Sequence, residues 1–133
     1  GEAAAVIGLD TSVVVRLITG EPAPSATAAR VRLEGAVERG ERVVVTDLVL
    51  VEAYIALHRH YRFPKAAARR ALRAMAESGV VEIEPGAAAA GLSGAAGAGV
   101  ADRIIHARHR SLGLVTLTFD RKQAALEGAE RIR

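Results

Sequence analysis

The chain has 133 residues, the size of one domain, so we expect residues 1–133 to form a single domain around one core. Half of the residues are apolar and a quarter are charged, which excludes general disorder, and the absence of cysteine excludes disulfides and thiolate metal sites. The missing cysteines also fit a reducing, cytoplasmic compartment, and the formal net charge of +3 tolerates an anionic partner without requiring one.

The first half of the chain alternates between strand and helix signals. The opening segment GEAAAVIG lacks the basic start and long apolar stretch of a secretion signal, so we expect none, and no apolar run approaches the roughly 18 residues of a membrane span. The expected elements are a strand at 6–9, a helix from a cap at 10–12 to about residue 18, a helix from a cap at Ser25 to near Gly40, a strand at 43–45, and a helix at 48–61 capped by Thr46 or Asp47.

The second half continues the alternation. The expected elements are a basic helix at 63–77 with Pro64 near its first turn, a strand at 80–85, a short helix and loop in the Gly- and Ala-rich 86–99, a helix at 100–113 stopped by Gly113, a strand at 114–120, and a fifth strand at 129–133. Short apolar strands alternating with helices predict an α/β fold with a mainly parallel sheet of four or five strands, covered on both faces.

Four acids have unusual positions in this scheme. Asp10 and Asp120 each follow a strand directly, so both should project from the same edge of the sheet, where ligands of such sheets bind. Asp102 lies in the first turn of the helix before the fourth strand. Glu52 has apolar residues three and four positions away on both sides, which favours burial, and a buried acid needs a partner.

Carboxylates crowded together repel one another unless a cation compensates them. Mg²⁺ or Mn²⁺ fits best, because these ions prefer oxygen ligands, keep several waters and are usually coordinated directly by only one or two carboxylates. Such a site can activate water and bind a phosphodiester. The sequence therefore predicts a magnesium or manganese site at this edge.

The same residues carry a family resemblance that covers nearly the whole chain. The motifs LDTS with Asp10, VEAYIAL with Glu52, ADRII with Asp102 and TFD with Asp120 resemble, in order, those of the PIN domain, especially the VapC-like ribonuclease toxins. This resemblance implies a three-layer α/β/α sandwich, Mg²⁺- or Mn²⁺-dependent RNA cleavage, a homodimer, and a cognate antitoxin protein that occludes the site.

The resemblance also implies a role for each residue. Asp10, Asp102 and Asp120 match the positions that gather the metal, and Glu52 matches the acid that completes the pocket through water or as a ligand. Thr118 matches a hydroxyl that supports the site. The chain departs from the family pattern at Arg103, where a small or apolar residue is common, and in GLSGAAGAG, where a longer helix is common.

The distribution of charge points to RNA as well. If the four acids belong to a metal site, the rest of the protein has 18 basic and 11 acidic groups. Its net charge of +7, before the cation is counted, suits binding to phosphates. The candidates for an RNA path are four cations of one helix, namely Lys65, Arg69, Arg70 and Arg73. A solvated basic face explains the same helix equally well.

His106 and His109 lie three positions apart, with Asp102 one turn before His106, and suggest a transition-metal site as a weaker hypothesis. The simpler interpretation is a helix with Ile104, Ile105 and Ala107 on its inner side and basic flanks.

Two alternatives from other functional classes stay open. A catalytically idle PIN-like module would bind RNA or a protein, although its four intact acids count against it. A phosphoacceptor signalling domain also places acids at strand ends, but it needs paired acids after its first strand, where Asp10-Thr11 offers one. A phosphatase of the haloacid-dehalogenase type would need Asp where Ser12 stands.

Overall fold

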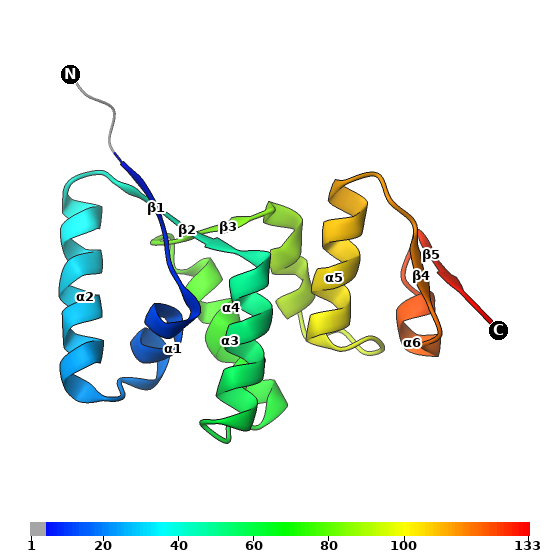
Figure 1. Cartoon of the computed structure of the whole chain (residues 1–133), viewed down its shortest axis with the longest axis horizontal. Coiled ribbons are helices and arrows are strands. Elements are labelled where there is room, and N and C mark those ends of the chain that lie inside the picture. The colour runs from blue at the N-terminus through cyan, green and yellow to red at the C-terminus, as the bar shows by residue number, and fades with distance from the viewer. Residues whose placement is uncertain (1–4) are drawn as a thin grey trace.

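The computed structural model describes residues 5–133 and has a mixed α/β architecture (Figure 1). Residues 1–4 lie outside the described part, so the expected lack of a secretion signal and the single domain over 1–133 stay predictions. None of the described helices is long and apolar enough to cross a bilayer.

The elements of the first half follow the predicted order. They are β1 (Val6–Gly8), α1 (Thr11–Thr19), α2 (Ala23–Glu38), β2 (Arg42–Thr46) and α3 (Asp47–Arg59). Asp10 is extended and caps α1, as predicted, while Gly20 ends that helix in the left-handed conformation that glycine adopts without steric cost. Helix α2 begins at Ala23, two residues before the expected cap Ser25, because Pro24 is accommodated in its first turn, where a missing N–H costs nothing.

The elements of the second half are shorter than predicted. They are α4 (Lys65–Glu77), β3 (Glu82–Glu84), the 3-10 helix η1 (Gly86–Leu92), α5 (Val100–Ser111), β4 (Thr116–Thr118), α6 (Arg121–Ala124) and β5 (Ala129–Arg131). The Gly- and Ala-rich segment is thus a short helix and a loop, as expected. Gly113 follows the end of α5 with a φ of 73°, as its stop role requires.

All strand pairings are parallel, but the strands form two sheets instead of one. The first sheet has the order β1-β2-β3, and the second contains β4 and β5 alone. Figure 1 shows β4, α6 and β5 on one side of α5, with α3 and the three-stranded sheet on the other. The prediction of a mainly parallel α/β fold is confirmed. The predicted single sheet of four or five strands is instead one sheet of three strands and one of two.

The main core lies around β2 and is made mostly of Ala, Val, Leu and Ile. Val43 and Val45 of the central strand are almost fully buried. They pack with Leu50 and Leu57 of α3 and with residues of the other helices, including Leu72 of α4. This core helps to fix the relative positions of β1, α3 and α5, which carry Asp10, Glu52 and Asp102 or their neighbours.

Candidate functional site

Asp10 follows β1 after one intervening residue, so the end of the strand fixes its position. Its carboxylate accepts a hydrogen bond from the Thr11 backbone N–H at 2.9 Å, and its side chain is exposed. The neighbouring Thr11 hydroxyl donates to Glu52 Oε2 at 3.4 Å. One residue therefore links two of the predicted acids, which lie 42 positions apart in the sequence.

The expected burial of Glu52 is wrong. Its side chain is exposed, because its apolar neighbours Leu48 and Ile55 are themselves 74% and 41% exposed. Burial of Glu52 would require another element to cover this stripe of α3. Among the described residues nothing does, so the carboxylate faces an open surface and not a core.

Asp102 and Asp120 form a second pair, joined through Gln123. The buried Gln123 donates its side-chain amide to the Asp102 carbonyl oxygen at 3.2 Å and its backbone N–H to Asp120 Oδ1 at 2.7 Å. Thr118 Oγ1 accepts from the Asp120 backbone N–H at 3.0 Å, which holds the start of α6. Asp120 thus caps α6, and the Thr118 hydroxyl holds the backbone of Asp120 in place.

The structure does not bring the two pairs together. Within residues 5–133, no group of three or more His, Cys, Asp or Glu residues lies close enough to hold a metal ion. The convergence of Asp10 and Asp120 required β4 to join the sheet of β1, and β4 pairs with β5 instead. Carboxylate oxygens suit a hard divalent cation in type, but their arrangement in a single copy of the chain does not.

Asp47, which the sequence indicated only as a possible helix cap, is a buried acid at the start of α3. Asp47 is 4% exposed and accepts two hydrogen bonds from Arg108 of α5, from Nε at 2.7 Å and from Nη2 at 2.8 Å. The hydrogen bond from the guanidinium holds the pKa of the Asp47 carboxyl below its ordinary value. The sequence does contain an indication of this acid, because Asp47 follows the end of the second strand much as Asp10 follows the end of the first.

This ion pair lines an open groove of about 310 Å³ between α3 and α5, which we call the α3–α5 groove. The groove is largely apolar in its other walls. They are formed by Leu48, Val51 and Glu52 of α3 and by Ile104, Ile105 and His109 of α5. Glu52 therefore joins two features, the Thr11 hydrogen bond at the end of β1 and the α3–α5 groove.

His106 has a structural role that the sequence did not indicate. It is buried, with Nδ1 2.6 Å from Thr116 Oγ1 and Nε2 2.7 Å from the Glu127 carbonyl oxygen. His109 Nδ1 lies 2.8 Å from the same Thr116 hydroxyl. The predicted inner side of α5 is wrong at Ile105, which is 45% exposed, because His106 faces β4 and β5 in its place.

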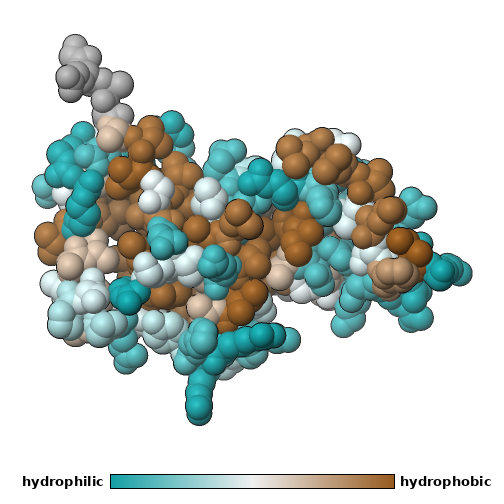
Figure 2. Space-filling view, viewed as in Figure 1, coloured by the Kyte–Doolittle hydropathy of each residue, from teal (hydrophilic) through white to brown (hydrophobic). Residues whose placement is uncertain are grey.

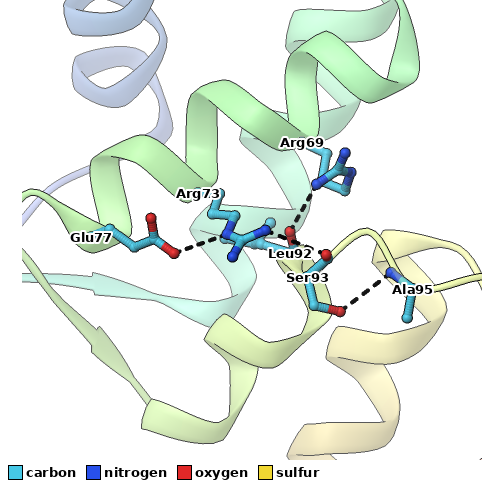
Figure 3. Close-up of polar contacts among 6 residues, drawn as sticks. All are labelled: Arg69, Arg73, Glu77, Leu92, Ser93 and Ala95. Atoms are coloured by element: carbon cyan, nitrogen blue, oxygen red, sulfur yellow. Dashed lines mark hydrogen bonds and ion pairs between the residues drawn. The ribbon is translucent and has the colours of Figure 1, made fainter.

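The four candidate cations of α4 divide into two kinds. Arg69 and Arg73 donate to the carbonyl oxygens of Leu92 and Ser93 at 3.2 and 3.4 Å, and Arg73 also pairs with Glu77 at 2.9 Å (Figure 3). These two fasten α4 to the end of η1. Lys65 and Arg70 are exposed to solvent.

A second open cavity, of about 340 Å³, lies where α4 meets the Gly- and Ala-rich loop and the start of α5. Lys65, Arg69 and Arg103 line it, and no acidic residue does. Arg103 donates to the carbonyl oxygens of Ala98 and Ala96 at 2.7 Å each, so its side chain fastens the Gly- and Ala-rich loop to the start of α5. We call this cavity the basic cavity.

Comparison with known proteins defines the class. The family model described as PIN domain matches residues 7–129, almost the whole chain, so the chain belongs to the PIN domain family and has its nuclease-type fold. Comparison with curated proteins and with solved structures gave no significant match. A phosphoacceptor domain is a different class of protein, and the family match leaves that alternative without support.

Proposed function

We propose that the chain is a metal-dependent endoribonuclease of the VapC-like kind, acting in the cytoplasm as the toxin of a toxin–antitoxin pair. Membership of a family of nucleases supports the reaction class. The observation that carries the proposal is the Asp10–Thr11–Glu52 contact, since it holds two acids from distant parts of the chain side by side at the end of β1.

The proposed cofactor is Mg²⁺ or Mn²⁺, for which Asp10, Asp102 and Asp120 are the proposed ligands and Glu52 the completing acid. These four carboxylates have the right donor chemistry, although within residues 5–133 no three acidic or histidine side chains lie close enough together to hold an ion. The proposed substrate path is the basic cavity with Lys65 and the neighbouring Arg70, because a cavity lined by cations suits a phosphate backbone. An antitoxin that covers the acids would control the activity.

The test is cleavage of structured RNAs in the presence of Mn²⁺, with EDTA as the control for metal dependence. Wild-type protein is expected to cleave, and Asp10→Asn is expected to lose most of that activity. Glu38→Gln serves as a matched control, because Glu38 is an exposed acid at the end of α2. Equal cleavage by wild type and Asp10→Asn would refute the assignment.

A second candidate function is an idle PIN-like module that binds RNA or a protein without cleaving. The separation of the two acid pairs within residues 5–133 favours it. Tight RNA binding without cleavage under any divalent metal, at every protein concentration tested, would support this module over the nuclease.

A further inference from the structure

The basic cavity lies where this chain departs from the family pattern. Arg103 and the Gly- and Ala-rich loop 94–99 line it, together with Tyr54 of α3 and with Lys65 and Arg69 of α4. Figure 2 shows a band of hydrophobic residues over the turn between α5 and β4, at the opposite end of α5 from this cavity. The proposed metal ligands need neither departure, so two unusual features that meet at one cavity indicate a site particular to this chain.

The positive charges around the cavity are not neutralised by acids. Arg69 donates to the Leu92 carbonyl oxygen at 3.2 Å, and Arg103 donates to two carbonyl oxygens of the loop at 2.7 Å each. A carbonyl oxygen accepts a hydrogen bond but carries no formal charge. In the described part of the chain, Lys65, Arg69 and Arg103 belong to no ion pair, and no acidic residue lines the cavity. Three cations around one space favour an anionic ligand.

The two arginines of the cavity are fixed before any ligand arrives. Gly94 has a φ of 78°, and a side chain there would begin 2.7 Å from Arg69 Nη1, so glycine lets the guanidinium lie against the loop. Figure 3 shows Arg69 reaching from α4 toward Leu92 at the end of η1. Arg103 is anchored through Nε and Nη2, which leaves its Nη1 without a hydrogen-bond partner within residues 5–133. Binding of a ligand therefore needs little further ordering of these side chains.

Lys65 and Tyr54 complete the cavity on two sides. Lys65 is exposed and lies four positions before Arg69, so the two cations project from the same side of α4. Tyr54 is half-buried, packs partly against the core and lines the cavity from α3. Most of the remaining wall is Gly and Ala, and the volume of about 340 Å³ is within the range of sites that hold a small organic molecule. An aromatic side chain beside cations is the combination that binds a nucleotide, since a base stacks on the ring and the cations hold the phosphate.

We infer that the basic cavity binds one unpaired nucleotide. Its phosphate lies between Lys65, Arg69 and Arg103, and its base lies against Tyr54. The nucleotide is free or belongs to a single strand, because a base that stacks on the protein is not paired in a duplex. Arg103 directly follows Asp102, so the bound nucleotide lies beside the helix turn that carries one proposed metal ligand. Such a subsite deepens the proposed RNA path, and it rests on the proposed function only for RNA as the source of the nucleotide.

Calorimetric titration in EDTA tests the cavity without metal and without RNA cleavage. The probes are AMP, adenosine and inorganic phosphate. AMP is expected to bind about tenfold more tightly than phosphate, the effect of one stacked base, and also more tightly than adenosine, which lacks the charge. Equal affinity for AMP and phosphate overturns the base contact, and equal affinity for AMP and adenosine overturns the phosphate contact. No binding of AMP overturns the nucleotide site as a whole.

Lys65→Gln tests the phosphate contact in the same titration. The variant is expected to bind AMP several-fold more weakly at an unchanged melting temperature, because Lys65 is exposed and its charge is lost. Arg59→Gln is the matched control and should bind AMP like wild type, since Arg59 is an exposed cation of α3 that does not line the cavity. A Lys65→Gln protein with wild-type affinity for AMP, or an equal loss in Arg59→Gln, overturns the phosphate contact.

Tyr54→Leu separates the base contact from the phosphate contact. The variant keeps an apolar side chain against the core, so its affinity for phosphate should be unchanged while AMP loses its advantage over phosphate. Tyr61→Leu is the matched control, because Tyr61 also packs partly against the core but does not line the cavity. It should keep the advantage of AMP, and the melting temperatures of the two variants report any loss of the fold. A folded Tyr54→Leu protein that still prefers AMP to phosphate overturns the base contact.

Competition in EDTA distinguishes the two sources of the nucleotide. A short single-stranded RNA is expected to displace AMP, and the same sequence in a duplex is expected to displace far less. Equal displacement by strand and duplex overturns the preference for an unpaired nucleotide. AMP binding that no RNA displaces supports a site for a free nucleotide and removes the cavity from the proposed RNA path. AMP binding without any RNA cleavage in Mn²⁺ would refute the proposed function alone, and RNA cleavage by a wild type that does not bind AMP would refute the nucleotide site alone.

Discussion

Arg108 of α5 holds Asp47 of α3 through two hydrogen bonds of 2.7 and 2.8 Å, and this contact joins the two helices that form the α3–α5 groove. The carboxylate is buried, while the Arg108 side chain is 45% exposed. The pair therefore stabilises the packing of α3 on α5 mainly because it gives the buried Asp47 carboxylate two hydrogen-bond donors. Its consequences for stability can be measured directly.

Asp47→Asn is expected to lower the free energy of unfolding at pH 7 by about 1–2 kcal/mol, a modest value because solvent screens the half-exposed Arg108. The pKa of Asp47 is lowered in the folded state, so its contribution is present above the ordinary aspartate pKa and is lost as the pH falls through the lowered value. Urea unfolding at several pH values checks this. The difference between wild type and variant should shrink below about pH 4, the ordinary range of aspartate. A difference that stays constant down to the lowest pH would contradict the assignment, and Glu38→Gln gives the baseline.

Thr116→Val is expected to destabilise the attachment of β4 to α5. The variant keeps the volume of the side chain but removes the hydroxyl that lies within 2.8 Å of both His106 and His109, at a cost of about 1–3 kcal/mol. Hydrogen exchange of the backbone amides at 116–131 should speed up more than exchange in β2. Thr27→Val, at an exposed position of α2, is the matched control. Equal acceleration throughout the chain would mean that Thr116 supports the whole fold and not this segment.

Much of the local structure follows from the sequence, because its causes are local. Asp10 caps α1 through the next backbone N–H, and Gly113 ends α5, so neighbouring residues suffice to predict both. The order of strands and helices is confirmed for the same reason. The parallel pairing of β1, β2 and β3 also follows, since helices connect these strands.

The candidate site depends on contacts that the sequence pattern does not contain. The run LVTLTFD alternates, but alternation does not say which face turns inward, and here the Thr116 face is the buried one. The choice is made by His106, whose residue type did not indicate burial. Likewise, apolar neighbours predicted that Glu52 is buried, and they failed because Leu48 and Ile55 have no cover within residues 5–133.

Thr11→Val tests whether the contact between Thr11 and Glu52 matters for the proposed reaction. The variant removes the hydroxyl that donates to Glu52 at 3.4 Å and leaves the backbone position at the start of α1 unchanged. A hydrogen bond worth about 1 kcal/mol predicts a several-fold lower kcat for RNA cleavage with little change in KM. Glu52→Gln should lose considerably more. If Thr11→Val cleaves RNA like wild type while Glu52→Gln is inactive, Glu52 acts without help from Thr11.

Lys65→Ala tests the proposed path of the RNA backbone. Lys65 is exposed and lines the basic cavity, so its loss should weaken binding to all RNA sequences by a similar factor. Binding measured at several salt concentrations should show a slope reduced by about 0.7, the contribution of one contact to a single-stranded phosphate. Arg73→Ala is expected to act differently, because Arg73 is engaged by Glu77 and the Ser93 carbonyl and its loss loosens the loop. The control is Arg30→Ala on α2, where the arginine pairs with Glu34 far along the chain from the cavity. A Lys65→Ala protein with the salt slope of wild type would exclude Lys65 from the path.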